Sequence, residues 1–244
     1  MKGKLTIVGF GPGSKEDMTL RAVKAIETAD IVTGYTTYID ILRAYFPGKH
    51  FKSTGMMREV DRCKSAIEDA SLGENVAIVS SGDSGIYGMA GIIYQLVDEM
   101  KADIDVEVVP GVTAASAAGS ILGAPLMHDL AIISLSDLMT PLDLIMKRVE
   151  AAGQSDLIVC IYNPRSKGRP DYLSQAADIL LKHRSTDTPV GIVRNAGREG
   201  QEKIITTLGK MDYDLVDMFS TVIVGNSQTY TSKGMMITPR GYKV

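Results

Sequence analysis

The sequence has little of several residue types that mark specialised protein classes. Its 244 residues include no tryptophan, two cysteines and three histidines. Cys63 and Cys160 are far apart in the sequence, so there is neither a disulfide framework nor a CxxC motif. His50, His128 and His183 show no HExxH or other paired ligand spacing. We therefore expect no dedicated metal site, and a reducing cytoplasm is the simplest compartment.

Long hydrophobic runs and an excess of positive charge are missing too. No apolar run reaches the roughly 18 to 20 residues that cross a bilayer, and glycine interrupts the N-terminal MKGKLTIVGFGPG too early for a signal peptide. Lys plus Arg total 26 and Asp plus Glu total 29, which gives a net charge of -3. This mild acidity, with only 6% aromatic residues, argues against a general nucleic-acid binder. We expect neither a membrane nor a nucleic-acid partner.

The sequence does contain a repeated alternation of buried strands, glycine-rich turns and amphipathic helices. This order is typical of an α/β fold with mostly parallel strand pairing. The chain length and a break near residues 110–130 predict two α/β domains of similar size, 1–115 and 116–244. Helices are predicted at 17–29, 36–46, 59–72, 86–100, 113–122, 141–152 and 172–182, and strands at 5–10, 31–33, 75–80, 106–109, 131–135, 156–161, 189–193, 202–207 and 219–224, with a polar tail after them.

Glycine-rich loops follow two of the predicted strands. The first, GFGPG at 9–13, is neither a dinucleotide fingerprint nor a P-loop, because Ser14 replaces the third glycine and no GK[ST] follows. Pro12 also removes an N–H that a phosphate cradle would use, so a plain turn and a ligand loop remain equal alternatives. The second, SGDSGIYG at 81–88, favours a ligand site, since a helix N-cap at Asp83 would not need so many glycines.

Further motifs follow later strands. Pro110–Gly119 is rich in small residues, which fits either tight packing or the close approach of a ligand. The loop Tyr162–Pro170 (YNPRSKGRP) places Arg165, Lys167 and Arg169 within five positions. Such a run is either a solvated face or a clamp for carboxylates or phosphates, which the arginine fork suits. A fifth motif, RNAGRE, begins at Arg194.

Taken in this order, the motifs resemble the tetrapyrrole methylases, enzymes of the cobalamin and sirohaem pathways that use S-adenosyl-L-methionine. The resemblance rests on GxGPG, on GDxxxY at Gly82–Tyr87, on PGVTAAS at Pro110–Ser116 and on the strand-end Asn195-Ala196. Together they cover nearly the whole chain. The resemblance implies two α/β domains with the active site in the cleft between them, a homodimer, and S-adenosyl-L-homocysteine as a product.

The same resemblance assigns methyl-donor contacts by position. Asn163 departs from the methionine that is common elsewhere in the family, and Ser84 stands where many members have proline. The expected contacts are Pro12, Ser81, Gly82, Asp83, Ile86, Thr113, Ala114, Asn163 and Ala196.

The middle of the chain resembles one branch of the family more than the others. HDLAIISLSDLMTP at His128–Pro141, YNPRSKGRP and VRNAGREGQ look like the branch that methylates C17 of precorrin-3B or cobalt-factor III, with ring contraction to the (cobalt-)precorrin-4 product. That acceptor is a macrocycle edged with acetate and propionate groups. Its expected carboxylate-binding residues are Arg58, Arg165, Lys167, Arg169 and Arg198.

Methyl transfer from a sulfonium disperses charge, so orientation and a dry site can supply most of the acceleration. Ring contraction with lactone closure needs proton transfer. His128, with an ordinary pKa near 6.5, is the obvious candidate, and Asp129 and Ser136 lie close to it in sequence. A capping or packing role for His128 stays open as the alternative.

Three other functions fit parts of the pattern. A methyltransferase for another carbon of the same macrocycle would share the donor motifs. An RNA-ribose methyltransferase of the same fold predicts a basic groove with stacking aromatics, which the composition disfavours. A nucleotide-binding regulator would bind the donor without transferring a methyl group.

Overall fold

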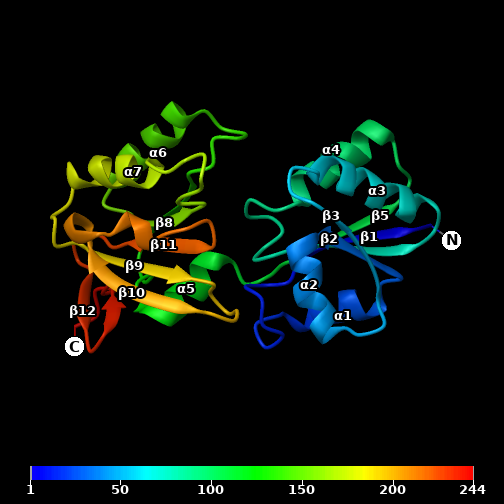
Figure 1. The fold of residues 1–244 in the computed structure, drawn as a ribbon, viewed down its shortest axis with the longest axis horizontal. Helices are drawn as coiled ribbons and strands as arrows, with labels where there is room; N and C mark the ends of the chain where they lie inside the picture. The colour runs from blue at the N-terminus through cyan, green and yellow to red at the C-terminus, as the bar shows by residue number, and fades with distance from the viewer. Residues whose placement is uncertain (1, 244) are drawn as a thin grey trace. The chain divides into compact units, whose positions relative to one another are not determined.

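The computed structural model describes residues 2–243. The chain divides into two compact units, Met1–Ala114 (unit 1) and Ala115–Val244 (unit 2). Each unit has its own five-stranded sheet with helices packed on it (Figure 1). The α/β fold class predicted from the sequence is therefore confirmed.

Unit 1 is a doubly wound parallel sheet. Its strand order is β3-β2-β4-β1-β5, and every pairing between neighbours is parallel. Figure 1 shows α1 and α2 on one face of this sheet and α3 and α4 on the other. The elements are β1 (Lys4–Gly9), α1 (Leu20–Thr28), β2 (Ile31–Tyr35), α2 (Thr36–Tyr45), β3 (His50–Thr54), α3 (Glu59–Ser71), β4 (Asn75–Ser80), α4 (Ala90–Met100) and β5 (Asp105–Val109).

Both faces of this sheet are buried, which explains the continuous apolar runs in its central strands. In β1, Leu5 and Ile7 pack among residues of α3 and α4, whereas Val8 packs among residues of α1 and α2. Local signals set several helix ends. The Thr19 hydroxyl accepts the Ala22 N–H and caps α1, and Gly73, with a φ of 98°, follows the end of α3.

Unit 2 has a mixed sheet of order β10-β9-β11-β8-β7. β7 and β8 pair in parallel, whereas β11 lies antiparallel to both β8 and β9, so β7, β8 and β9 all run in one direction. The elements are α5 (Ala114–Leu122), β6 (Gly123–Ala124), β7 (Leu130–Ser134), α6 (Leu142–Gln154), β8 (Ile158–Tyr162), α7 (Tyr172–Leu181), β9 (Pro189–Arg194), β10 (Glu202–Thr207), the short 3-10 turns Leu208–Lys210 and Tyr213–Leu215, β11 (Ser220–Val224), β12 (Tyr230–Ser232) and β13 (Met235–Ile237).

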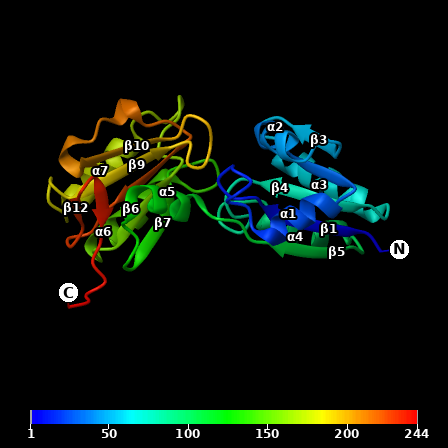
Figure 2. The same cartoon turned by 90° about the horizontal axis from the view of Figure 1, so that it is seen from below.

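The two faces of the unit 2 sheet are covered differently. Residues of α6 and α7 form the larger core with one face. The small residues of α5 pack on the other face together with Met236 of β13, and Figure 2 gives a second view of α5 and the short strands. Gly191 in β9 leaves room for Leu122 of α5, because an added Cβ would lie 2.4 Å from a methyl carbon of Leu122 and that side chain would have to shift.

Four sequence expectations need correction. β3 was not predicted, because its sequence HFKST lacks an apolar run and it is an edge strand. The residues expected to be a polar tail include the β12–β13 hairpin. β10 and β11 make unit 2 mixed rather than mostly parallel. Helix α4 begins at Ala90 instead of residue 86, since the preceding residues form a loop in which Tyr87 has a φ of 55°.

Among residues 2–243, no helix combines the length and the apolar character needed to span a membrane.

Candidate active site

The strand order of unit 1 contains a topological switch point between β1 and β4. From β1 the chain crosses to β2, which lies beyond β4, and from β4 it crosses to β5, which lies beyond β1. The two connections therefore leave the neighbouring strands β1 and β4 in opposite directions. In open α/β sheets, ligands bind at such a point, beyond the carboxyl ends of the strands. GFGPG and SGDSGIYG are the two loops that begin there. We call them, together with Pro110–Thr113 after β5, the glycine edge.

Backbone contacts join the loops of the glycine edge. The Gly11 N–H donates to the Gly82 carbonyl at 3.0 Å, and the Gly82 N–H donates back to the Gly11 carbonyl at 2.8 Å. An added Cβ on Gly111 would lie 2.1 Å from the Gly82 carbonyl oxygen and 2.4 Å from that of Gly9. Glycine is therefore needed because three backbones approach closely. Tight turns alone would not require it at all of these positions.

Asp83 connects the loop after β4 with the loop after β5. Its Oδ1 accepts the Gly85 N–H at 2.8 Å, and its Oδ2 accepts the Gly111 N–H at 3.0 Å. The carboxylate therefore holds the edge in shape. It is not the N-cap of α4, whose N-cap position is Met89.

The other expected donor contacts of unit 1 lie on the same loops. Pro12 is buried in the first loop, Ser81 is half-buried, and Ile86 is 37% exposed in the second loop. Thr113 ends the third loop and Ala114 begins α5, and an added Cβ on Gly82 would lie 3.8 Å from the Ala114 nitrogen. The structure thus gathers Pro12, Ser81, Gly82, Asp83, Ile86, Thr113 and Ala114 at one edge of the unit 1 sheet.

Unit 2 gathers its own motif loops in the same way. Because β7, β8 and β9 run in one direction, the loops at 135–141, 163–171 and 195–201 meet at one edge of the sheet. We call these loops the side-chain edge. Asn163 donates from Nδ2 to the Ser134 hydroxyl at 2.9 Å. Asn163 and Asn195 both have a φ of 50°, a left-handed conformation that asparagine tolerates.

Ala196 lies in the third of these loops, directly after Asn195. It packs against the core cluster that contains α5. Both expected donor contacts of unit 2, Asn163 and Ala196, therefore lie on the side-chain edge.

Arg169 ties together two loops of the side-chain edge. Its Nη1 donates to the Ser136 hydroxyl at 2.6 Å and lies 3.5 Å from Oδ1 of Asp137, while its Nε donates to the Ser166 hydroxyl at 3.1 Å. The Tyr172 hydroxyl donates to the other Asp137 oxygen at 2.8 Å. That bond, more than Arg169, holds the pKa of Asp137 below its ordinary value, and the same bond raises the pKa of Tyr172.

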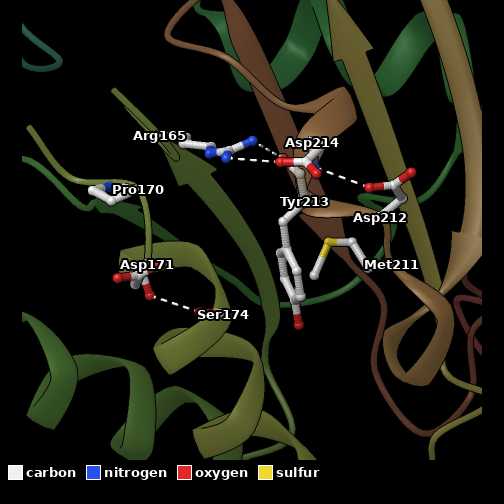
Figure 3. A pocket seen from close by; sticks show the side chains of 8 residues that line it. All are labelled: Arg165, Pro170, Asp171, Ser174, Met211, Asp212, Tyr213 and Asp214. Carbon is white, nitrogen blue, oxygen red and sulfur yellow. Dashed lines mark hydrogen bonds and ion pairs between the residues drawn. The ribbon is translucent and has the colours of Figure 1, made fainter. Parts of the chain in front are cut away.

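Arg165 is already engaged by protein groups. Its Nη1 donates to the Tyr213 carbonyl at 2.6 Å and its Nη2 to Asp214 at 2.8 Å. Figure 3 shows the guanidinium turned toward Asp214 at the wall of a cavity of about 290 Å³. Asp171 and Asp212 also line this cavity, so it carries more negative than positive charge. The cavity is thus a poor carboxylate site.

The remaining expected substrate residues are scattered. Lys167 is exposed in the same loop as Arg169, and Arg198 lies on the side-chain edge, with its backbone N–H donating to the Asn195 carbonyl. Arg58 belongs to unit 1, where its Nε pairs with Asp61 at 2.5 Å on the first turn of α3. Arg58 is therefore not one of the residues of unit 2 that make up the side-chain edge.

The three expected catalytic residues are not together. His128 and Asp129 precede β7, whereas Ser136 follows it. At about 3.3 Å per residue the two positions are separated by roughly 20 Å along the strand. The Asp129 N–H donates to Nδ1 of His128 at 3.0 Å. His128, Asp129 and Ser136 therefore cannot act on one reacting atom, which corrects the expectation of a joint site.

Comparison with known proteins decides the family. The model of the tetrapyrrole (corrin/porphyrin) methylases matches residues 4–212. The chain belongs to this family.

Individual relatives of this tetrapyrrole methylase are similar over its full length. It is 54% identical to a probable cobalt-factor III C(17)-methyltransferase of Salmonella typhimurium, covering 98% of this chain and 99% of that protein. It is 47% identical to a cobalt-factor III methyltransferase of Priestia megaterium, covering 100% of this chain and 46% of that protein. The chain thus spans just under half of the second relative. The crystal structure of the methyltransferase CobJ matches with a TM-score of 0.90 at 31% identity, covering 97% of this chain and 100% of that one.

Sequence reasoning about this tetrapyrrole methylase missed two residues of the side-chain edge. Asp137 is not among the expected site residues, and Tyr172 was assigned only to a helix. One sequence feature indicated Tyr172: it lies two residues after the basic loop Tyr162–Pro170 and begins α7. Because β7 and β8 are parallel neighbours, the loop after β8 lies beside the loop after β7, which contains Asp137. Within residues 2–243, no group of three or more His, Cys, Asp or Glu side chains is placed to hold a metal ion.

Proposed function

We propose that this tetrapyrrole methylase transfers a methyl group from S-adenosyl-L-methionine to C17 of cobalt-factor III, with ring contraction to cobalt-precorrin-4. The observation that carries the proposal is the 54% identity to the Salmonella typhimurium protein over almost the full length of both chains. The Priestia megaterium relative is also named for cobalt-factor III, which favours the cobalt-bearing acceptor over precorrin-3B.

The glycine edge suits this donor better than a dinucleotide. Its first loop has Ser14 in place of the third glycine of the dinucleotide fingerprint, and Pro12 there has no N–H to offer a pyrophosphate. When bound, S-adenosylmethionine supplies a methyl group on a positively charged sulfur. We assign its binding to the backbones and side chains of Pro12, Ser81, Gly82, Asp83, Ile86, Thr113 and Ala114, and the prediction adds Asn163 and Ala196 from unit 2.

For the acceptor carboxylates we favour Arg169 among the five expected residues. Arg165 and Arg58 are paired with acidic side chains, and Lys167 is exposed and has no ion pair or hydrogen bond within the described residues 2–243. Arg198 remains a prediction. An arginine that is already held in place loses little conformational entropy when it binds a carboxylate.

The prediction of proton transfer by His128 and Asp129 conflicts with acceptor binding at Arg169, because these two residues precede β7 and Arg169 contacts Ser136 after it, so we assign them no step. Ser136 is assigned none either, since its hydroxyl accepts the Arg169 Nη1–H. Methyl transfer itself needs orientation more than acid–base groups.

We also propose a homodimer that works in the cytoplasm. The family resemblance supports the dimer, and the buried, unpaired Cys63 and Cys160 fit a reducing compartment. Burial raises the pKa of Cys63 to about 11 and that of Cys160 to about 12, so neither thiol is a nucleophile at neutral pH. Light scattering of the purified chain would test the dimer.

The deciding experiment is anaerobic incubation with methyl-labelled S-adenosylmethionine and cobalt-factor III, precorrin-3B or uroporphyrinogen III. We expect label at C17 of cobalt-factor III, read by mass spectrometry and NMR. Label at C17 of precorrin-3B alone would mean that the acceptor carries no cobalt. Label at another carbon would mean that the enzyme belongs to a different branch of the family. Donor binding with no transfer to any acceptor would overturn the proposed activity.

A further inference from the structure

The Arg169 guanidinium is held on two sides and unoccupied on the third. Its Nε and Nη1 contact Ser166, Ser136 and Asp137, and its side chain is only 17% exposed. Its Nη2 has no hydrogen-bond partner in the part of the chain that the structure describes. A half-immobilised arginine with an unused donor nitrogen is suited to bind a planar carboxylate.

Asp137 and Tyr172 fix this arrangement. Tyr172 donates to Oδ2 of Asp137 at 2.8 Å, which leaves Oδ1 to face Nη1 of Arg169 at 3.5 Å. The contact from Asp137 to Arg169 is single and long, so it is not the two-point fork that would occupy the guanidinium completely. The pKa of Asp137 is lowered and that of Tyr172 raised, hence the carboxylate is ionised and the phenol protonated at neutral pH.

We propose that Asp137 and Tyr172 are positioning residues that hold Arg169 so that its Nη2 binds an acetate or propionate carboxylate of the acceptor. The inference rests on the proposed function, because that function supplies an acceptor with such side chains. Asp137 and Tyr172 do not touch the acceptor themselves. They act by fixing the rotamer of Arg169, and Ser136 supports the same nitrogen, Nη1.

Arg165, the other arginine of this loop, is held differently from Arg169. Arg165 uses Nη1 and Nη2 on Tyr213 and Asp214, which leaves neither terminal nitrogen fully available. Arg169 uses only one of its two. The two arginines lie in one loop with the same formal charge, so their partners decide which one binds an anion.

Asp137 affects carboxylate binding by Arg169 in two opposing ways. The direction in which acceptor binding changes when the Asp137 charge is removed shows which effect is larger. Its negative charge weakens the attraction of Arg169 for a second carboxylate. Its contact with Nη1, together with the bonds that Arg169 donates to Ser136 and Ser166, holds the guanidinium in one place and so reduces the entropy lost on binding. The proposal requires that positioning outweighs repulsion, so that removal of the Asp137 charge weakens acceptor binding.

The experiment uses the full chain under anaerobic conditions. Cobalt-factor III binding is followed by its own visible absorbance, and kcat, acceptor KM and the donor Kd are measured in parallel. The variants are Arg169→Gln, Arg169→Lys, Asp137→Asn, Tyr172→Phe and the double variant Arg169→Gln/Asp137→Asn. Arg148→Gln on the exposed side of α6 and Tyr94→Phe, which is 49% exposed on α4, are the matched controls.

We expect Arg169→Gln to raise the acceptor Kd and KM roughly 30-fold or more, the range for truncating one partner of a charge pair. Asp137→Asn and Tyr172→Phe should raise them about threefold to tenfold, the cost of a typical hydrogen bond. Donor Kd and kcat should stay near wild type. Arg169→Lys should not restore binding, because an ammonium group lacks the planar fork. Asp137→Asn should add little in the Arg169→Gln background.

An acceptor KM that falls in Asp137→Asn would mean that Asp137 competes with the acceptor, and it would overturn the inference. Full additivity of the two substitutions would also overturn it, since Asp137 would then not act through Arg169. Equal losses in donor and acceptor binding would indicate a merely structural role. If wild type methylates cobalt-factor III at C17 and Arg169→Gln binds it normally, only this inference fails. If wild type neither binds nor methylates any tetrapyrrole, the proposed function fails first.

Discussion

Backbone groups hold the glycine edge of unit 1 together, whereas side chains hold the side-chain edge of unit 2 together. In unit 1, loops meet backbone to backbone through the paired hydrogen bonds of Gly11 and Gly82 and the close approach of Gly111. In unit 2, loops meet through side chains, with Asn163 on Ser134 and Arg169 on Ser136. A backbone surface offers fixed N–H and C=O groups to a compact ligand. A side-chain surface offers charge and hydroxyl groups, which suit a larger acidic one.

The two edges should therefore fail in different ways. Added atoms harm a backbone-packed edge because nothing there can move aside cheaply. An edge built from side chains tolerates added atoms better and depends on individual donors and acceptors.

The largest effect is expected from Gly111→Ala. Its Cβ would lie 2.1 Å from the Gly82 carbonyl oxygen, so the loops of the glycine edge must separate. We expect a loss of about 3 kcal/mol in the free energy of unfolding and a donor Kd raised at least about tenfold. Urea unfolding and calorimetric titration with S-adenosylmethionine measure the two quantities.

Gly55→Ala is the control, because the described chain leaves open space around an added Cβ at that position. It should change the free energy of unfolding by less than about 0.5 kcal/mol. A Gly111→Ala protein as stable as this control would show that the glycine edge is not close-packed.

An intermediate effect is expected from Asp83→Asn. The carboxylate accepts two backbone N–H groups with its two oxygens, and an amide has only one oxygen, so one of those N–H groups would face an NH₂ donor. We expect the donor Kd to rise about tenfold and the free energy of unfolding to fall by about 1 to 2 kcal/mol. Asp40→Asn on the exposed side of α2 is the control. A normal donor Kd in Asp83→Asn would remove Asp83 from the donor site.

The smallest effect concerns pH and the side-chain edge. The pKa of Asp137 in the folded protein is lowered, mainly by the Tyr172 hydroxyl, so its contribution to stability is full above the ordinary value of 3.8. That contribution is lost as the pH falls through the lower folded pKa. Tyr172→Phe should therefore lose less stability than wild type as the pH falls from about 5 to 3.

Urea midpoints measured at several pH values check this expectation, and Tyr94→Phe should follow the wild-type curve. Parallel curves for wild type and Tyr172→Phe would show that Tyr172 does not hold the Asp137 carboxylate.

Much of the fold was predictable because its signals are local. The apolar runs of β1, β4 and β8 mark strands, and the helical spacing at 17–29 and 59–72 marks α1 and α3 to within a few residues. The glycine loops were also predictable as a ligand edge, since each follows a buried strand. Edge strand β3 and the β12–β13 hairpin were missed, because short polar strands are defined by the strand beside them.

The site was predictable only as a set of loops. Asp83 was expected to face a ligand, yet both of its oxygens accept backbone N–H groups, one of them from a loop 28 residues away. Four arginines and a lysine were expected to bind carboxylates, but nothing in the sequence shows that Arg165 is paired with Asp214. His128 and Ser136 are eight residues apart in sequence, and a strand places them at opposite sheet edges.

By itself, the sequence determined the α/β elements, the strand-end loops and the resemblance to the family, because helix periodicity, strand burial and glycine turns depend on neighbours along the chain. The tertiary structure alone decided which loops meet, which arginine keeps an unused nitrogen and which of the expected catalytic residues lie together. Those outcomes depend on strand order and direction, which bring distant residues within hydrogen-bonding distance and leave no trace in local spacing.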